Sequence, residues 1–140
     1  MDDCTFCDIL AGTTEASFVA AEDRVVAFTD ILPIGEGHTL VIPRRHAIGL
    51  HDLDPEDGAA MFRLAQRIAS AQRRLRLAEG VNLFLADGVI AGQEVFHAHL
   101  HVLPRQDGDA LRLHVDYEPP PTRAKLDATA ARLREALGTT

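Results

Sequence analysis

Residues 97–103 read His-Ala-His-Leu-His-Val-Leu, and this run decides how the rest of the chain is interpreted. Its alternation of polar and apolar residues predicts a β-strand over residues 95–103, because alternate side chains of a strand share one face. His97, His99 and His101 then lie on the same face, roughly 6.5 to 7 Å apart between successive Cα atoms. The intervening apolar residues face the other way, toward a core. A buried imidazole nitrogen without a partner costs about 1–3 kcal/mol, so the histidine face is expected to be open to solvent or to a ligand.

Three interpretations of this histidine face follow from the residues alone. The first is an exposed strand that is rich in histidine. The second is a metal site, but three histidines along a straight strand lie too far apart to meet one ion at about 2.1 Å unless the strand bends. The third is nucleophilic and acid–base chemistry. Imidazole has a pKa of about 6.5, so one neutral ring can attack while another carries a proton, and nucleotidyl transfer needs both functions.

Other segments of the chain also read as strands. Residues 24–30 and 38–42 are apolar and β-branched, and the loop between them holds one proline and two glycines. This pattern predicts an antiparallel hairpin. A further strand is predicted over residues 81–86.

Two helices complete the predicted fold. A long helix is expected over residues 55–78, because Asp54 can cap it and Pro55 suits its first turn. Its apolar side chains recur at helical spacing: Met61, Ala65, Ile68, Ala69 and Leu75. A last helix can begin after Thr122, with the apolar face Leu126, Ala130, Leu133 and Leu137. This order of elements indicates an α+β domain with an antiparallel sheet.

Length and charge narrow the choice of function. A chain of 140 residues is the size of one domain, and an apolar fraction of 46% suffices for a buried core. The net charge of −7 argues against a nucleic-acid partner, because a polyanion would be repelled. No apolar run is long enough to span a membrane, and the first residues lack the layout of a signal peptide. We therefore expect a cytoplasmic protein that binds a small molecule, without nucleic-acid or membrane partners.

Residues 91–105 read AGQEVFHAHLHVLPR and closely resemble the signature of the histidine triad (HIT) family. Residues 28–31 and 39–43 also follow the order and spacing of that family. The resemblance implies a HIT-like α+β fold, with an antiparallel sheet of about five strands, one long helix packed on it and a C-terminal helix. Family members are typically homodimers whose sheets join across the two-fold axis.

The same resemblance places one HIT domain over residues 1–140, with its core at about 4–105 and an extension with the last helix at 106–140. It implies an enzyme that acts on the α-phosphate of a purine nucleotide. Such an enzyme releases a nucleoside monophosphate, expected to be AMP, from a phosphoramidate, a dinucleoside polyphosphate or a similar substrate. The alternative is a non-catalytic module of the same fold that binds nucleotides or a partner for regulation.

The resemblance also assigns roles to individual residues near the phosphate. His99, the middle histidine, would attack phosphorus and form a covalent nucleotidyl-histidine intermediate. His101 would hydrogen-bond the phosphate and assist the leaving group. His97 would support the ring geometry or serve elsewhere, and Gln93 would contact phosphate oxygens.

Further positions would hold the nucleoside. Asp30 would accept hydrogen bonds from the ribose hydroxyls, which suits a carboxylate because it is an acceptor only. Four apolar side chains would wall the purine, although without the resemblance they favour a core: Phe6, Ile9, Phe28 and Ile31. Two positions depart from the family pattern. Ala86 stands where many relatives carry Asn or Gln, and Glu94 stands where the branch that cleaves phosphoramidates commonly has Ser or Thr.

The chain has two cysteines, Cys4 and Cys7, which have the spacing of half a zinc site. The residues alone leave two interpretations, partly buried thiols or metal ligands. The resemblance supplies the second half of the site as His46 and His97. Four protein ligands leave no open position on the metal, so we expect a structural Zn2+ and no organic cofactor. No role is assigned to the remaining histidines: His38, His51 and His114.

Overall fold

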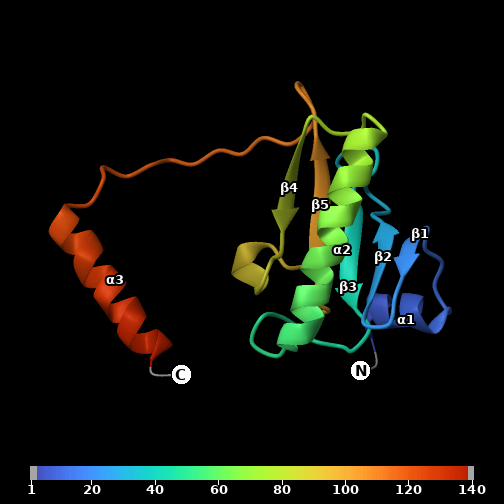
Figure 1. Ribbon diagram of the computed structural model, residues 1–140, viewed down its shortest axis with the longest axis horizontal. Helices are drawn as coiled ribbons and strands as arrows, with labels where there is room; N and C mark the ends of the chain where they lie inside the picture. Colours follow the sequence, from blue (N-terminus) through green and yellow to red (C-terminus); the bar gives the residue numbers. More distant parts are fainter. Residues whose placement is uncertain (1–2, 139–140) are drawn as a thin grey trace.

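The computed structural model describes residues 3–138, which contain a five-stranded antiparallel sheet with helices on both of its faces (Figure 1). The strands follow the spatial order β1-β2-β3-β5-β4. Their bounds are β1 Phe18–Ala21, β2 Val25–Thr29, β3 Thr39–Pro43, β4 Gly80–Phe84 and β5 Leu100–Arg105. The helices are α1 Thr5–Ala11, α2 Pro55–Arg74, the short 3-10 helix η1 Val89–Ala91 and α3 Arg123–Leu137. The expected fold class, α+β with an antiparallel sheet, one long helix and a C-terminal helix, is confirmed.

The predicted hairpin is present as β2 and β3, which pair antiparallel with Val25 opposite Pro43. The strand predicted over 81–86 is present as β4. The sequence pattern predicts neither α1 nor the edge strand β1. Helix α1 starts at an unusual cap, since the Cys4 sulfur accepts the backbone N–H of Cys7 at 3.3 Å. Strand β1 is exposed along most of its length and lacks an alternating pattern.

Helix α2 lies along one face of the sheet and begins as predicted. The Asp54 side chain accepts the backbone N–H of Glu56, and Pro55 occupies the first turn. The buried side chains of α2 pack against β2, β3 and β5 in one core cluster. Its members are Met61, Leu64, Ala65 and Ile68 from the helix, with Val25, Ala27, Val41 and Val102 from the strands.

The prediction that this helix reaches residue 78 is wrong. The helix stops earlier, and Leu75, which was expected in its apolar stripe, is 69% exposed. The stop comes from Arg76, whose φ of 61° lies in the left-handed region. The backbone N–H of Leu77 then donates back to the carbonyl of Gln72 at 2.9 Å, which closes the helix without the glycine that usually ends one.

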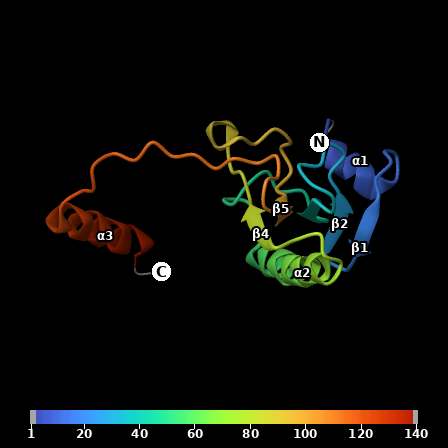
Figure 2. The same ribbon diagram turned by 90° about the horizontal axis from the view of Figure 1, so that it is seen from above.

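The opposite face of the sheet packs against α1, which Figure 2 shows on the other side of the strands from α2. A second cluster forms there from Cys4, Phe6 and Ile9 of the N-terminal segment with Val26, Phe28, Leu40 and Ile42 of the strands. Alternate residues of β2 therefore enter different clusters, as the two-residue period of a strand requires.

The predicted strand over residues 95–103 is partly wrong. β5 starts only at Leu100, so His97 and His99 lie in the segment that leads into the strand, and only His101 lies within it. The strand itself is interior, between β3 and β4.

β5 starts late even though its neighbour β3 continues past the first pair of their ladder. The ladder between the two strands begins where Val41 faces Leu100, and β3 ends at Pro43. Just before the ladder the N–H of Ala98 donates to the carbonyl of Ala47 at 2.7 Å, so this stretch is bonded to a loop and not to a strand.

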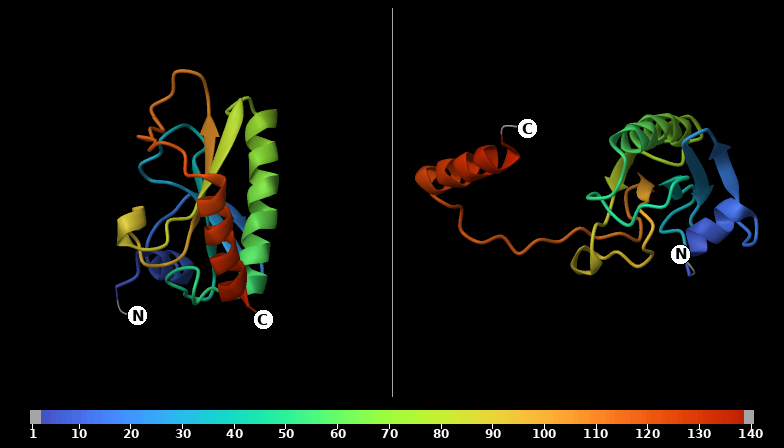
Figure 3. Two further views of the ribbon diagram at one scale, coloured as in Figure 1. Left: turned by 90° about the vertical axis from the view of Figure 1, so that its left-hand side faces the viewer. Right: turned by 90° about the horizontal axis from the view of Figure 1, so that it is seen from below.

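After β5 the chain leaves the sheet. Residues 106–122 run outward and lead to α3, which lies away from the rest of the molecule in Figure 1 and Figure 3. Thr122 caps α3 as predicted, because its side chain accepts the backbone N–H of Lys125 at 3.2 Å. The residues of α3 are exposed, including those of its predicted apolar face. Between residues 3 and 138 no helix combines the length and the apolar character that crossing a membrane requires.

Candidate functional site

A cleft of about 950 Å³ lies beside α1 and is lined by α1, by β2, by the loops that follow both and by the segment that enters β5. The structure brings all four predicted purine-wall residues to its lining: Phe6, Ile9, Phe28 and Ile31. Three of them are buried in the second cluster, whereas Ile31 is 91% exposed at the rim. The sequence left open whether these residues form the core or a pocket. Phe6, Ile9 and Phe28 do both, because they belong to the buried cluster and also line the cleft.

Two of the three triad histidines also line the cleft. His99 and His101 do so, with ring centroids 5.0 Å apart, and Asp30 lines it too. His97 is fully buried and is not among the lining residues. The three histidines therefore do not share one open face, because the segment before β5 does not follow the geometry of a strand.

One hydrogen bond sets the tautomer of His99. Its Nδ1 lies 2.7 Å from the carbonyl oxygen of His97, which can only accept, so Nδ1 carries the proton and donates it. The lone pair of a neutral ring then lies on Nε2. The edge of the ring also packs against Phe6, at 5.1 Å between ring centroids. His99 is thus held with an unprotonated nitrogen available for attack.

A chain of hydrogen bonds sets the tautomer of His101. The backbone N–H of Ile34 donates to Nδ1 of His38 at 3.1 Å, so His38 carries its proton on Nε2. That Nε2 lies 2.9 Å from Nδ1 of His101 and donates to it. The proton of His101 is therefore on Nε2, which makes this nitrogen a donor.

His38 also belongs to this site, although the sequence analysis assigned it no role. It is 2% exposed, and its Nε2 lies 3.6 Å from the Asp30 carboxylate as well as beside His101. The signal that could have found it is the register of β3 and β5, which pairs Leu40 with His101 and brings the start of β3 beside the triad.

Burial keeps these rings neutral. Desolvation, followed by the nearby rings of His99 and His38, lowers the pKa of His101 to about 4. Desolvation likewise lowers the pKa of His38, against a smaller opposing effect of Asp30. At neutral pH the pair of His38 and His101 is a chain of hydrogen-bond donors and not a pair of cations.

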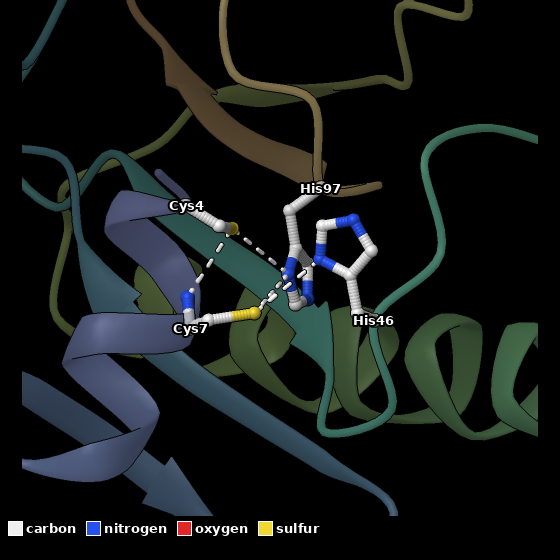
Figure 4. Close-up of side chains that lie close together, drawn as sticks. All are labelled: Cys4, Cys7, His46 and His97. Carbon is white, nitrogen blue, oxygen red and sulfur yellow. Dashed lines mark hydrogen bonds between the residues drawn. The ribbon is translucent and has the colours of Figure 1, made fainter. Parts of the chain in front are cut away.

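The predicted metal ligands Cys4, Cys7, His46 and His97 form a separate cluster, and Figure 4 shows their side chains pointing toward one another. Their candidate ligand atoms all lie within 4.8 Å of one another. The Nε2 of His97 donates to the carbonyl of Pro43 at 2.8 Å, so its Nδ1 presents a lone pair to the sulfurs. Burial, followed by the hydrogen bond and the charge of Cys4, raises the pKa of Cys7 to about 11.

The spacing of these donors fits a tetrahedral metal. Zinc bonds of about 2.3 Å to sulfur and 2.0 to 2.1 Å to nitrogen, at tetrahedral angles, put sulfur and nitrogen about 3.6 Å apart. The sulfur–nitrogen separations are 3.5 Å for Cys4 with His97, 3.3 Å for Cys7 with His46 and 3.6 Å for Cys7 with His97. Three of the six donor–donor separations in the cluster therefore match the edges of a zinc tetrahedron.

Comparison with known proteins identifies the family of this chain. Residues 11–108 match the family model described as HIT domain. The chain belongs to the HIT family. It is 43% identical over 136 residues to the uncharacterized HIT-like protein Rv1262c of Mycobacterium tuberculosis. The matched region covers 96% of this chain and 92% of that protein.

Solved structures of other HIT proteins superpose on this one. A Zn-bound histidine triad family protein from Mycobacterium smegmatis is 40% identical, with a TM-score of 0.75 over 96% of this chain and 97% of that one. A histidine triad nucleotide-binding protein from Candida albicans is 27% identical, with a TM-score of 0.87 over 96% of this chain and 97% of that one.

Within this HIT protein, Gln93 does not line the cleft. Its side chain is buried and already bonded to the backbone: it accepts the N–H of Gly88 at 2.8 Å and donates to the carbonyls of Ile48 and Val95 at 2.7 and 3.1 Å. A contact between Gln93 and a phosphate stays a prediction and would require one of these bonds to open. Glu94 lines the cleft and Ala86 does not.

The cysteine–histidine cluster and the cleft meet at two residues of this HIT protein. His97 offers Nδ1 to the cluster, while its carbonyl accepts the proton of His99. Phe6 lies between Cys4 and Cys7 in sequence and packs its ring against both histidines, at centroid distances of 5.9 and 5.1 Å. The cluster therefore borders directly on His99, although none of its four residues lines the cleft.

Proposed function

We propose that this HIT protein binds a purine nucleotide and is a nucleotide hydrolase or nucleotidyl transferase that releases AMP. The observation that carries the proposal is the pair of fixed tautomers in the cleft: His99 with a free lone pair beside His101 with an N–H donor. A nucleophile and a donor side by side are what displacement at phosphorus needs. The substrates considered are phosphoramidates, dinucleoside polyphosphates and related derivatives of AMP.

In the first step the lone pair of His99 Nε2 attacks the α-phosphorus. The bond from phosphorus to the leaving atom breaks, its electron pair goes to that atom, and a proton from solvent joins it. His101 donates a hydrogen bond from Nε2 to the leaving atom or to a phosphate oxygen, where negative charge develops. Water then attacks phosphorus and loses a proton, the electron pair of the N–P bond returns to His99, and AMP departs. The net reaction consumes one water.

The nucleoside has a natural place in the same cleft. Phe6, Ile9 and Phe28 form an apolar wall for a flat base, and Ile31 can cover it from the rim. Asp30 is half-buried beside this wall and offers carboxylate oxygens to the ribose hydroxyls, although one oxygen also accepts the N–H of Leu32.

We also propose that the cysteine–histidine cluster holds a structural zinc ion. The donor spacing supports this assignment, and so does the existence of a Zn-bound relative. Zinc bound there supplies four bonds that tie the N-terminal segment to the loop after β3 and to the histidine segment. These bonds would then hold α1 in place, and α1 carries part of the purine wall. The ligands would be Cys4, Cys7, His46 and His97.

A homodimer and a cytoplasmic location complete the proposal. α3 exposes an apolar face away from the sheet of its own chain, and the outer edge of β4 has no strand paired to it in the described part of the chain. Both features would be covered if two copies joined sheets and exchanged C-terminal arms. A reducing compartment suits paired thiols that serve as ligands.

The test of catalysis uses His99→Ala beside the wild type. The variant loses the nucleophile but keeps the purine wall and Asp30, so it should still bind AMP while hydrolysis of an AMP phosphoramidate, a dinucleoside polyphosphate and adenosine phosphosulfate is abolished. Wild type quenched during turnover should show, by mass spectrometry, a nucleotidyl adduct on His99. Wild type that binds AMP and cleaves no member of the panel would favour the non-catalytic module instead.

A further inference from the structure

Gln72 is a buried polar side chain on α2, across the sheet from the cleft. It is 3% exposed, and α2 packs on the face of the sheet opposite α1, as Figure 2 shows. Its Nε2 donates two hydrogen bonds, to the carbonyl of Gly37 at 2.9 Å and to the carbonyl of Val102 at 3.1 Å. Gly37 immediately precedes His38, and Val102 immediately follows His101. One amide therefore joins the two backbones that carry the hydrogen-bonded pair of histidines.

The amide lies at the point where the pairing of β3 with β5 stops. The last pair of that ladder is Thr39 opposite Val102. Continuing the same register would put Gly37 opposite Pro104, which has no N–H to donate. Gln72 supplies a donor to the Gly37 carbonyl, which also accepts the hydroxyl of Thr39 at 2.9 Å. The spacing of the two strands at this end therefore depends on a side chain of α2 as well as on the ladder.

The end of α2 holds the same turn by a second contact. Gly37 has a φ of 91°, and a β-carbon on it would lie 3.0 Å from Cδ1 of Leu77. Leu77 is itself tied to Gln72, because its backbone N–H donates to the Gln72 carbonyl at 2.9 Å. A glycine at position 37 thus lets the turn before His38 approach the end of the helix closely.

The two partners decide the orientation of the Gln72 amide. Carbonyl oxygens can only accept, so the nitrogen of the amide must face both of them. Its Oε1 is then buried, and it accepts no hydrogen bond from any residue between 3 and 138. A buried acceptor without a partner lowers stability, so an apolar side chain of the same length would remove that penalty together with the two hydrogen bonds. The amide therefore suits the placement of the two carbonyls better than stability alone.

We propose that Gln72 is a positioning residue for the reaction and acts by holding His38 at hydrogen-bond distance from His101. The inference rests on the proposed function for its effect on turnover. While both carbonyls are held, Nε2 of His38 lies 2.9 Å from Nδ1 of His101 and fixes the His101 proton on Nε2. Without the amide the two backbones can separate, and that proton can move to Nδ1. The face of the sheet that is remote from the cleft thereby controls which nitrogen of His101 meets the leaving group as a donor.

The test removes the amide and keeps its volume. Gln72→Met has a side chain of similar length without donors, and Gln72→Leu repeats the measurement with a branched side chain. The kcat/KM for an alkylamine phosphoramidate of AMP should fall roughly two- to tenfold, because the bond between the histidines is weakened and not abolished. The 4-nitrophenyl ester of AMP should show little change, because its leaving group needs little assistance.

Two control variants separate this effect from a loss of stability. Ile68→Val shortens a buried side chain of the same helix, in the cluster that packs on the sheet, and changes no hydrogen bond. Gln66→Met makes the same substitution at an exposed position of α2. Both controls should keep the wild-type ratio of activities on the two substrates. The thermal midpoint of Gln72→Met should fall no further than that of Ile68→Val.

Two further measurements depend on the histidine pair itself. In a double-mutant cycle, Gln72→Met should cause no additional loss in a His38→Phe background, because both changes act on the same bond to His101. Nitrogen-15 NMR of the imidazoles reports which ring nitrogen carries the proton, and it needs no turnover. The proton of His101 should be on Nε2 in the wild type and in both controls. It should be found partly on Nδ1 when Gln72 is replaced by Met or Leu.

The outcomes separate the positioning role from the catalytic proposal. Unchanged tautomers in the Gln72 variants, equal losses on the two substrates, additive losses in the cycle or failure of both variants to fold would each overturn the positioning role. A tautomer change in the variants, with no turnover of either compound by any of the proteins, would instead overturn the proposed catalysis and leave the placement of His38 by Gln72 standing.

Discussion

The hydrogen-bond chain that ends at His101 can be cut at its first ring. His38→Phe keeps an aromatic ring in a site that is 2% exposed but removes the N–H that donates to His101 Nδ1 at 2.9 Å. The proton of His101 can then move to Nδ1, and its Nε2 would face the leaving group as an acceptor. His38→Gln is the conservative partner, because an amide can still donate from a similar position.

The expected loss is set by the energy of this buried hydrogen bond. Leaving one partner unsatisfied costs about 1–3 kcal/mol, and 1.36 kcal/mol corresponds to a factor of ten in rate. His38→Phe should therefore lower kcat/KM roughly five- to 150-fold for a substrate whose departure needs help. His38→Gln should recover a large part of that loss.

The assay separates two AMP derivatives that differ in their leaving group. An alkylamine phosphoramidate is a poor leaving-group substrate and should show the full loss, whereas the 4-nitrophenyl ester of AMP needs little assistance and should show much less. His51→Phe serves as the control, because that imidazole is 72% exposed and lies outside the cleft. Equal losses on both substrates in a folded His38→Phe protein would refute the proposed path from His38 through His101 to the leaving group.

Three other changes have measurable outcomes. Cys4→Ser should release zinc, detected by elemental analysis, and lower the thermal midpoint more than kcat; full zinc content in the variant would contradict the ligand set. The pKa of His101 is about 4 in the folded chain and about 6.5 when unfolded, so between these values only the unfolded state binds the proton. The free energy of unfolding in urea should thus fall by roughly 1–3 kcal/mol as pH drops from about 6.5 to 4, and less in His101→Gln. Leu133→Asp should shift the sedimenting mass toward a single chain, unlike Ala128→Asp on the opposite side of α3; equal masses would argue against exchanged arms.

Local pattern was enough to predict the elements whose residues interact mainly with neighbours in sequence. The caps at Asp54 and Thr122 and the loop between β2 and β3 are of this kind. The end of α2 was mispredicted because Arg76 adopts a left-handed conformation, for which arginine carries no sequence signal. α1 was missed because its cap is a cysteine, a residue whose role depends on partners far along the chain.

The candidate site shows the same limit at the level of single side chains. An ideal strand places alternate histidines together, so the alternation of residues 97–101 predicted one face with three rings. The structure divides them because Ala98 bonds to Ala47, which takes the segment out of the ladder. The hydrogen bond that keeps His97 and His99 out of the strand joins Ala98 to Ala47, which lies 51 residues earlier in the sequence. A local pattern of polar and apolar residues cannot predict such a contact.

The division has a chemical consequence for the nucleophile. His97 is buried against Pro43 and faces the thiols, so its ring is unavailable to a substrate. Its carbonyl oxygen accepts a hydrogen bond from Nδ1 of His99, at 2.7 Å between the two atoms. A nucleophilic imidazole needs one nitrogen without a proton, and a carbonyl acceptor on the other nitrogen is the partner that enforces this. In the proposed reaction His97 would therefore act through its backbone, while its side chain belongs to the cysteine–histidine cluster. The spacing of one residue between His97 and His99 is what allows a single residue to meet both demands.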